Sequence, residues 1–351
     1  MPHSDDLTEK PLTTDQESDG TPLLSVRNLS IEFATDTGWL RVTDDVSFDV
    51  LEGETLGLVG ESGSGKTVTS LAVMGLIDKR EGRLSPESSI KFQDEELIGK
   101  SVRNLNKLRG KDIAMIFQEP MASLNPAFTV GQQVSEAIRI HTDSSKSQAW
   151  TRAVEMLDRV GIPSPKERAK SYPHQFSGGM AQRVMIAMAL ACDPKLLIAD
   201  EPTTALDVTV EADILDLLSS LKRDMGMGVL FVTHDLGVVQ SFCNRAMVMY
   251  AGQVVAEANV DSLYHAPVHP YVEGLLASIP DPYSEADEMW SIPGVVPQPT
   301  AMPDGCRFHP RCSYAVTEQC AVSPIPLDRF GDRAARCVRV DEIELHGIKR
   351  D

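Results

Sequence analysis

The sequence contains no run of 18 apolar residues, so no segment is long and apolar enough to cross a bilayer as a helix. Its first twenty residues are polar and acidic and include no apolar stretch, unlike a secretory signal peptide or a transit peptide. A stretch of this composition buries too little apolar surface to fold. We therefore expect residues 1–22 to form a disordered acidic tail.

Positive charge is also scarce. The chain has 33 Lys and Arg residues against 51 Asp and Glu residues, a formal net charge of −18 at pH 7. Wide contact with nucleic acid and adsorption to anionic lipid both require basic groups, so this balance argues against both kinds of partner. A salt-adapted surface and a merely solubilising one would each explain the acidic excess, and the sequence does not separate them.

A glycine-rich stretch lies between an apolar strand pattern at Leu56–Val59 and a helical pattern. It matches the phosphate-binding pattern G-x-x-x-x-G-K-[ST], whose glycines let the backbone wrap round an anion at a helix N-terminus. The lysine adds a charge for the β- and γ-phosphates, and the threonine hydroxyl can ligate Mg²⁺. The residues predicted to bind a nucleotide here are Gly60, Glu61, Ser62, Gly63, Ser64, Gly65, Lys66 and Thr67.

Three further apolar runs predict buried strands, at Ile113–Phe117, Leu196–Ala199 and Val229–Val232. A helical stripe separates the last two, and strand–helix–strand alternation indicates an α/β fold with a mostly parallel sheet. The pattern from Glu119 to Tyr172 is helical and predicts an insertion, whereas Met247–Ala256 predicts an edge hairpin.

Two acidic residues directly follow the run at Leu196–Ala199. The carboxyl ends of parallel strands line the ligand crevice of such a sheet. Asp200 is therefore placed to reach Mg²⁺, and Glu201 to polarise a water in line with the γ-phosphate. A pair of acids at a solvated strand end is common, but that explanation leaves the following segment, PTTALD, unexplained.

These motifs resemble the ATP-binding subunit of an ABC transporter, over Leu24–Glu257. Six elements of that family occur in order: the Walker A loop, the Q-loop Gln118, the signature Ser177–Gln182, the Walker B strand with Glu201, the D-loop with Asp207 and the switch residue His234. The resemblance implies a P-loop NTPase fold of the ABC type. Such a fold has a mostly parallel sheet, an antiparallel edge subdomain, a helical insertion at about 119–180 and, here, a small irregular Cys-rich C-terminal domain.

The resemblance also implies roles for residues around ATP. Glu201, His234 and Gln118 are the expected catalytic group, and Thr67, Gln118 and Asp200 the expected Mg²⁺ ligands. Phe33 is the expected aromatic partner of adenine, with Trp39 as its rival, and ordinary core packing would explain either ring equally.

The signature is expected to act on a different nucleotide. Ser177 is a good helix N-cap, and the two glycines after it leave the helix N-terminus uncovered. By resemblance, this second anion site meets the γ-phosphate of ATP bound to another subunit, so that two ATP molecules lie head to tail between two chains. The residues concerned are Ser177, Gly178, Gly179 and Gln182. The segment has FSGGM where the family has LSGGQ, and we expect no loss of function from this difference.

Beyond about Asp261 prolines become dense and periodicity fades, which predicts a domain boundary. We expect a nucleotide-binding domain at 23–260 and a C-terminal domain at 261–351. The latter begins with His265–Tyr271 and Leu275–Pro280, which resemble the extension of oligopeptide and dipeptide importer ATPases.

Four cysteines follow with the spacing C-x5-C-x7-C-x16-C: Cys306, Cys312, Cys320 and Cys337. Disulfides are disfavoured because an ATP-hydrolysing domain belongs in a reducing compartment. Structural zinc lacks its usual C-x(2–4)-C spacing, and four thiolates can hold an iron–sulfur cluster instead. By resemblance to the importer subfamily we rank a [4Fe–4S] cluster first and Zn²⁺ second.

The resemblance implies an ATPase that energises peptide import from the cytoplasmic face of the cell membrane. Its expected partners are a second ABC ATPase, two permease subunits and, indirectly, an extracytoplasmic peptide-binding protein. A heterodimer of two different ATPases is the favoured arrangement, with a homodimer as the alternative. An importer of nickel or another small solute is the alternative. A soluble ABC clamp is disfavoured because the chain has one cassette and no long coiled-coil insertion.

Overall fold

The computed structural model describes residues 21–204, 206–279 and 291–348. Its central element is an eight-stranded sheet with the order β12-β13-β11-β10-β3-β9-β8-β7. Five consecutive strands are parallel, with β9 at the middle of the set. They are β10 (Arg245–Tyr250), β3 (Thr55–Val59), β9 (Gly228–Thr233), β8 (Leu196–Asp200) and β7 (Ile113–Ile116). The predicted apolar runs thus form the buried, parallel part of the sheet.

The predicted hairpin at Met247–Ala256 is confirmed as β10 and β11 (Gln253–Asn259), but its place at the edge is wrong. Strand β13 (Arg333–Ala335) pairs with β11, and β12 (Asp328–Phe330) pairs with β13. An exposed edge leaves backbone polar groups unpaired, and here a distant segment covers it. Residues 261–348, called the C-terminal segment below, therefore share a sheet with the preceding residues, called the cassette.

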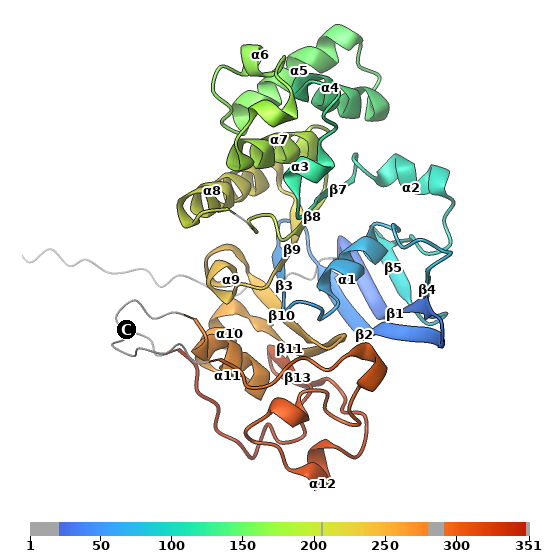
Figure 1. The fold of residues 1–351 in the computed structure, drawn as a ribbon, viewed down its shortest axis with the longest axis vertical. Coiled ribbons are helices and arrows are strands. Elements are labelled where there is room, and N and C mark those ends of the chain that lie inside the picture. Colours follow the sequence, from blue (N-terminus) through green and yellow to red (C-terminus); the bar gives the residue numbers. More distant parts are fainter. Residues whose placement is uncertain (1–20, 205, 280–290, 349–351) are drawn as a thin grey trace, which may run out of the picture.

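A second, antiparallel sheet lies beside the first, with the order β2-β1-β5-β6 and β4 paired to β1 (Figure 1). Its strands are β1 (Leu24–Thr35), β2 (Gly38–Val50), β4 (Gly82–Leu84), β5 (Ser89–Phe92) and β6 (Glu95–Glu96). The register of β1 against β2 shifts between Val26 and Leu29, which accounts for the imperfect alternation of apolar residues there.

Helices fill the stretch between β7 and β8, and Figure 1 shows them at the opposite end of the molecule from α12. They are α3 (Pro120–Ser123), α4 (Val130–His141), α5 (Lys146–Arg159), α6 (Pro165–Arg168) and α7 (Gly178–Leu190), with a 3-10 turn at Pro173–Gln175. Capping boxes at Thr129 and Ser145 set the starts of α4 and α5.

The remaining helices pack on the sheets or lie in the C-terminal segment. They are α1 (Lys66–Val73), α2 (Val102–Leu108), α8 (Val208–Met225), α9 (Leu236–Phe242), α10 (Val260–His265), α11 (Pro270–Ala277) and α12 (Thr317–Cys320), with 3-10 turns at Pro299–Ala301 and His309–Arg311. One apolar core lies between the helical insertion and the sheet, a second between the two sheets, and a third joins β10 and β11 to α10 and α11. No helix within the described ranges is long and apolar enough to span a bilayer.

Candidate nucleotide site

The phosphate loop follows β3 and leads directly into α1. Gly60 has φ 154°, and a Cβ there would lie 2.2 Å from the Met249 carbonyl oxygen. Gly65, the residue before α1, has φ 101°. Both positions therefore require glycine, because other residues would be strained or would clash. The loop can take this shape only with glycine at these two positions.

Three polar side chains hold the base of the loop. Lys66 Nζ donates to the carbonyl oxygens of Gly60 at 2.7 Å and Glu61 at 3.1 Å. Thr67 Oγ1 donates to Asp200 Oδ1 at 3.2 Å. Burial raises the pKa of Asp200 to about 6, with the Thr67 hydrogen bond acting in the opposite direction. Burial also lowers the pKa of Lys66, against the attraction of Glu201 and Asp200.

Glu201 is where the polar groups of this site meet. Its Oε2 accepts from Gln118 Nε2 at 3.0 Å and from Thr204 Oγ1 at 2.9 Å, and lies 3.4 Å from His234 Nδ1. Its Oε1 lies 3.9 Å from Lys66 Nζ. The backbone of Glu201 has φ 47°, a costly conformation for a residue other than glycine. Local strain of this kind is typical of functional sites.

These residues line one cavity of about 590 Å³, a size typical of ligand sites. Gln118, Glu201 and His234 lie on it, although they come from the ends of three different strands. The phosphate loop from Glu61 to Thr67 forms the rest of the polar wall. The predicted catalytic residues and the predicted phosphate-binding residues are thus brought together, and the cavity can hold a phosphate chain with a carboxylate beside it.

The sequence of this chain matches two protein families and many known proteins. Residues 43–204 match the family described as ABC transporter, and residues 255–320 match the oligopeptide/dipeptide transporter C-terminal region. A putative peptide import ATP-binding protein of Brucella abortus (strain 2308) is 50% identical over 317 residues, which are 90% of this chain and 94% of the relative. The chain belongs to the ABC transporter family.

Other relatives of this ABC ATPase carry similar names. The dipeptide transport ATP-binding protein DppD of Escherichia coli (strain K12) is 48% identical over 90% of this chain and 96% of its own. The oligopeptide transport ATP-binding protein AppD of Bacillus subtilis (strain 168) is 47% identical over 91% and 97%.

Among solved structures, the ATP-binding cassette MJ0796, a dimer in a post-hydrolysis state bound to ADP and Pi, matches with a TM-score of 0.60. It is 29% identical and covers 68% of this chain and 98% of its own. The cassette is therefore a P-loop NTPase fold of the ABC type, and the chain is an ATPase.

The signature of this ABC ATPase lies apart from the phosphate-loop cavity. Ser177 caps α7 and accepts from the Met180 amide, and it is not among the residues lining the 590 Å³ cavity. A Cβ at Gly179 would lie 2.7 Å from Val210 Cγ1, so glycine permits close packing on α8. The side chain of Gln182 is buried inside the chain rather than exposed for a contact with a partner's ATP. It is 1% exposed, because α7 is buried almost all round.

Neither candidate aromatic reaches the phosphate-loop cavity. Phe33 packs at the margin of the core between the sheets, and Trp39 is 45% exposed with the Arg83 guanidinium 4.1 Å from its ring centre. The apolar lining comes instead from Val42, Val68 and Leu275. A role of Phe33 beside adenine stays a prediction.

The D-loop residue Asp207 caps α8 by accepting from the Val210 amide, and Ala205 of the same loop lies outside the described residues.

Three contacts to this site had no basis in the sequence analysis. Thr204 could have been found, because it lies three residues after Glu201 in the segment that already required explanation. Leu275 and Tyr271 could not, since they come from α11, more than two hundred positions beyond the phosphate loop, and nothing in their local pattern refers to it.

The four clustered cysteines also meet. All four line one small cavity of about 20 Å³, together with His269, Phe308 and Arg339. Burial raises the pKa of Cys306 to about 12 and that of Cys312 to about 11, and neighbouring thiols act in the same direction. All six cysteines of the chain are free. Within the described ranges, no three His, Cys, Asp or Glu side chains are arranged to hold a metal ion.

Proposed function

We propose that this ABC ATPase energises the import of peptides across the cytoplasmic membrane, as a peripheral subunit on its cytoplasmic face. The support is the match of residues 255–320 to a region of oligopeptide/dipeptide transporters, together with relatives named for peptide import over 90% of the chain. The observation that carries the ATPase mechanism is the convergence of Gln118, His234 and Thr204 on Glu201.

Each group at the site then has a task. The phosphate loop and Lys66 bind the β- and γ-phosphates, and Glu201 accepts a hydrogen bond from the attacking water. Gln118 and His234 touch the same carboxylate, so they fix its direction. A carboxylate that is already oriented needs little reorganisation when the water attacks.

Mg²⁺ fits the remaining donors. Thr67 and Asp200 place two oxygen atoms 3.2 Å apart beside the loop. Mg²⁺ commonly binds one or two protein oxygens and completes its shell with water and phosphates, so a site without three acidic or histidine ligands suits it. Bound there, Mg²⁺ would neutralise charge developing on the phosphates. Gln118 is the third proposed ligand.

The site is completed by a second subunit in this proposal. Ser177 and the glycines after it lie outside the phosphate-loop cavity, so ATP on the loop leaves this helix N-terminus free for another nucleotide. The dimeric structure of the related cassette MJ0796 supports the arrangement. A second, different ATPase is the proposed partner.

The proposed domains of this chain are a nucleotide-binding domain at 23–260 and a C-terminal domain at 261–351.

Permease subunits are proposed to dock beside the Q-loop. A cavity of about 460 Å³ opens there between β7, α4 and α7. Its lining is apolar and rich in flexible thioethers, with Met74, Met115, Met185 and Met188 beside Phe117, which is 40% exposed. Phe117 precedes Gln118, so a partner seated in this cavity would contact the segment that carries a catalytic group.

The test of the whole proposal is reconstitution. The chain, its partner ATPase and the two permeases should co-purify, and ATP hydrolysis should rise when peptide-loaded binding protein is added. Met188→Glu should abolish co-purification with the permeases and leave hydrolysis by the pair of ATPase subunits, without permeases, unchanged. Stimulation by a nickel-loaded binding protein, with none by peptide, would favour the alternative cargo.

For the cysteines we propose a [4Fe–4S] cluster. The four thiols share one cavity with the imidazoles of His269 and His309, and no carboxylate is among the residues that line it. The four thiols are the donors that a Cys₄ iron–sulfur centre requires. The space of about 20 Å³ is that of about one water molecule, so binding would require the segments that carry the thiols to move apart. Protein purified without oxygen should be brown, with broad absorption near ~400 nm. Colourless protein with stoichiometric zinc would contradict the cluster.

A further inference from the structure

The second residue of the phosphate loop is held by the C-terminal segment. Both carboxylate oxygens of Glu61 lie 3.1 Å from Arg311 Nη1. The backbone N–H of Glu61 donates to Tyr271 Oη at 3.1 Å. These partners lie 250 and 210 positions further along the chain. A single loop residue is thus fixed through both its side chain and its backbone by a distant part of the sequence.

Arg311 is fixed independently of Glu61. Its Nε donates to the Pro293 carbonyl oxygen at 2.9 Å, and its Nη2 donates to the Ile292 carbonyl oxygen at 3.3 Å. Its guanidinium carbon lies 5.7 Å from the centre of the Tyr250 ring. The side chain of Arg311 is 6% exposed and that of Glu61 30%. The arginine is therefore the anchored partner, and the loop is the part whose position the ion pair sets.

Tyr271 is equally immobile. It is fully buried, and its ring packs on Tyr250 and Phe308 at centre distances of 4.7 Å and 5.2 Å. Because its hydroxyl oxygen accepts the Glu61 amide, this N–H points toward the C-terminal segment. The carbonyl oxygen of Glu61 accepts a hydrogen bond from Lys66 Nζ. The orientation of Glu61 therefore bears directly on the lysine that binds phosphate.

We propose that Arg311 and Tyr271 are positioning residues for the phosphate loop: they clamp Glu61 and thereby set the affinity of this ATPase for ATP. Leu275 of α11 lines the same cavity, so the C-terminal segment supplies both the clamp and part of the wall. The proposal rests on ATP as the ligand of the loop. It gives the C-terminal segment a part in nucleotide binding, which the Walker motifs alone do not require.

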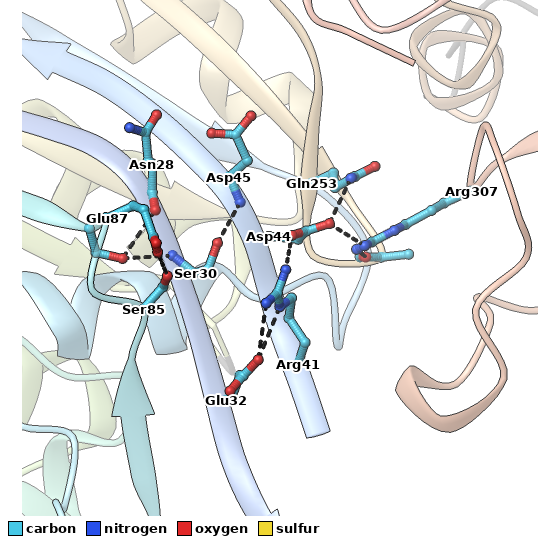
Figure 2. Close-up of polar contacts among 12 residues, drawn as sticks. Asn28, Ser30, Glu32, Arg41, Asp44, Asp45, Ser85, Glu87, Gln253 and Arg307 are labelled. Carbon is cyan, nitrogen blue, oxygen red and sulfur yellow. Dashed lines mark hydrogen bonds and ion pairs between the residues drawn. The ribbon is translucent and has the colours of Figure 1, made fainter. Parts of the chain in front are cut away.

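A second arginine of the same segment offers a matched control. Arg307 Nη2 contacts Asp44 Oδ2 at 2.6 Å, and its Nη1 donates to the Ala251 carbonyl oxygen at 2.6 Å. Figure 2 shows this contact within a polar network around Asp44 that includes Arg41 of β2 and Gln253 of β11. Arg307 precedes Arg311 by four positions, is also largely buried and also joins the segment to the cassette. None of its contacts reaches the phosphate loop.

The experiment measures ATP hydrolysis by the assembled transporter at varied ATP, together with thermal unfolding. Arg311→Gln should raise KM for ATP about tenfold, because a charge-assisted pair is lost, while kcat changes less than about threefold. Arg311→Lys should recover part of the affinity, since it keeps the charge but loses the donors that Nε and Nη2 supply to the carbonyl oxygens of Pro293 and Ile292. Tyr271→Phe should shift KM in the same direction, because it leaves the Glu61 amide without an acceptor.

The controls separate positioning from general support. Arg307→Gln should lower the melting temperature about as much as Arg311→Gln but leave KM for ATP at the wild-type value. The pair Glu61→Gln and Arg311→Gln should be non-additive in KM, as expected for partners in one contact. Equal KM values for the two arginine variants would overturn the proposal and reduce the segment to structural support. Absence of ATP hydrolysis by wild type would instead refute the proposed function.

Discussion

The phosphate-loop site and the cysteine site are built in opposite ways. Around the loop, Gly60, Gln118, Glu201 and His234 each lie within two residues of the end of a fully buried strand in the parallel part of one sheet. Around the cysteines, the structural elements are three or four residues long, and arginines that donate to backbone carbonyls hold the segments together. In the first site, each functional residue follows the strand that positions it. The second site depends on contacts between residues that are distant in the sequence.

The largest test of this comparison is at the strand ends. Glu201→Gln should lower kcat for ATP hydrolysis by about 10²–10⁴-fold while ATP binding persists, because the amide cannot act as a general base but keeps the shape of the side chain. The nucleotide-bound dimer should accumulate and be visible by size-exclusion chromatography. Asp213→Asn on the exposed face of α8 is the control, with unchanged kcat. Wild-type turnover in the Glu201 variant would show that another group activates the water.

The difference in construction explains what could be predicted from the sequence. The run before Asp200 and Glu201 predicted a buried strand. The parallel sheet then placed Glu201 at the cavity that Gln118 and His234 share, and Asp200 beside Thr67 of the phosphate loop. The edge position of β11 was wrong because its neighbour β13 comes from a proline-rich region without periodicity. The contact of Arg311 Nη1 with both carboxylate oxygens of Glu61 has no local sequence signal, since it depends on the folding of the intervening chain.

The next test removes an arginine from the cysteine site. Arg336 is 7% exposed, and it donates to the carbonyl oxygens of Val254 at 2.9 Å and Ile325 at 2.7 Å. Arg336→Met should lower the free energy of unfolding by about 2–4 kcal/mol, because two buried acceptors lose their donors. Chemical denaturation measures this change. Arg329→Met, at a side chain 69% exposed, should change stability by less than about 0.5 kcal/mol.

A pH titration should affect the stability of the C-terminal segment through His269, which lies at the start of α11. Burial lowers the pKa of His269 to about 3, and the nearby charge of Arg336 acts in the same direction. Above pH 6.5, the approximate pKa of histidine in the unfolded chain, the ring is neutral in both the folded and the unfolded state. The free energy of unfolding is therefore at its full value there. As pH falls from about 6.5 toward 3 the unfolded chain binds a proton that the folded chain does not. Stability should then fall by up to about 1.4 kcal/mol per pH unit.

His269→Asn is the control for this titration. The ring of His269 caps α11 by accepting from the Tyr271 amide, and asparagine is a good N-cap that does not titrate. The difference between wild type and variant in the free energy of unfolding should therefore change with pH only below about 6.5. A constant difference between pH 7 and pH 4 would show that the imidazole is free to take up a proton in the folded protein.

The smallest expected effect concerns the residue of the strand-end site that sequence reasoning missed. Thr204 donates to the same Glu201 oxygen as Gln118, so Thr204→Ala removes one of the hydrogen bonds that orient the carboxylate. One such bond is worth about 0.5–1.5 kcal/mol, and kcat should fall by roughly two- to tenfold with KM for ATP unchanged. Thr204→Ser keeps the hydroxyl and should restore most of the rate. If Thr204→Ala instead raised KM and left kcat alone, the hydroxyl would act on nucleotide binding, and the strand ends alone would suffice to orient Glu201.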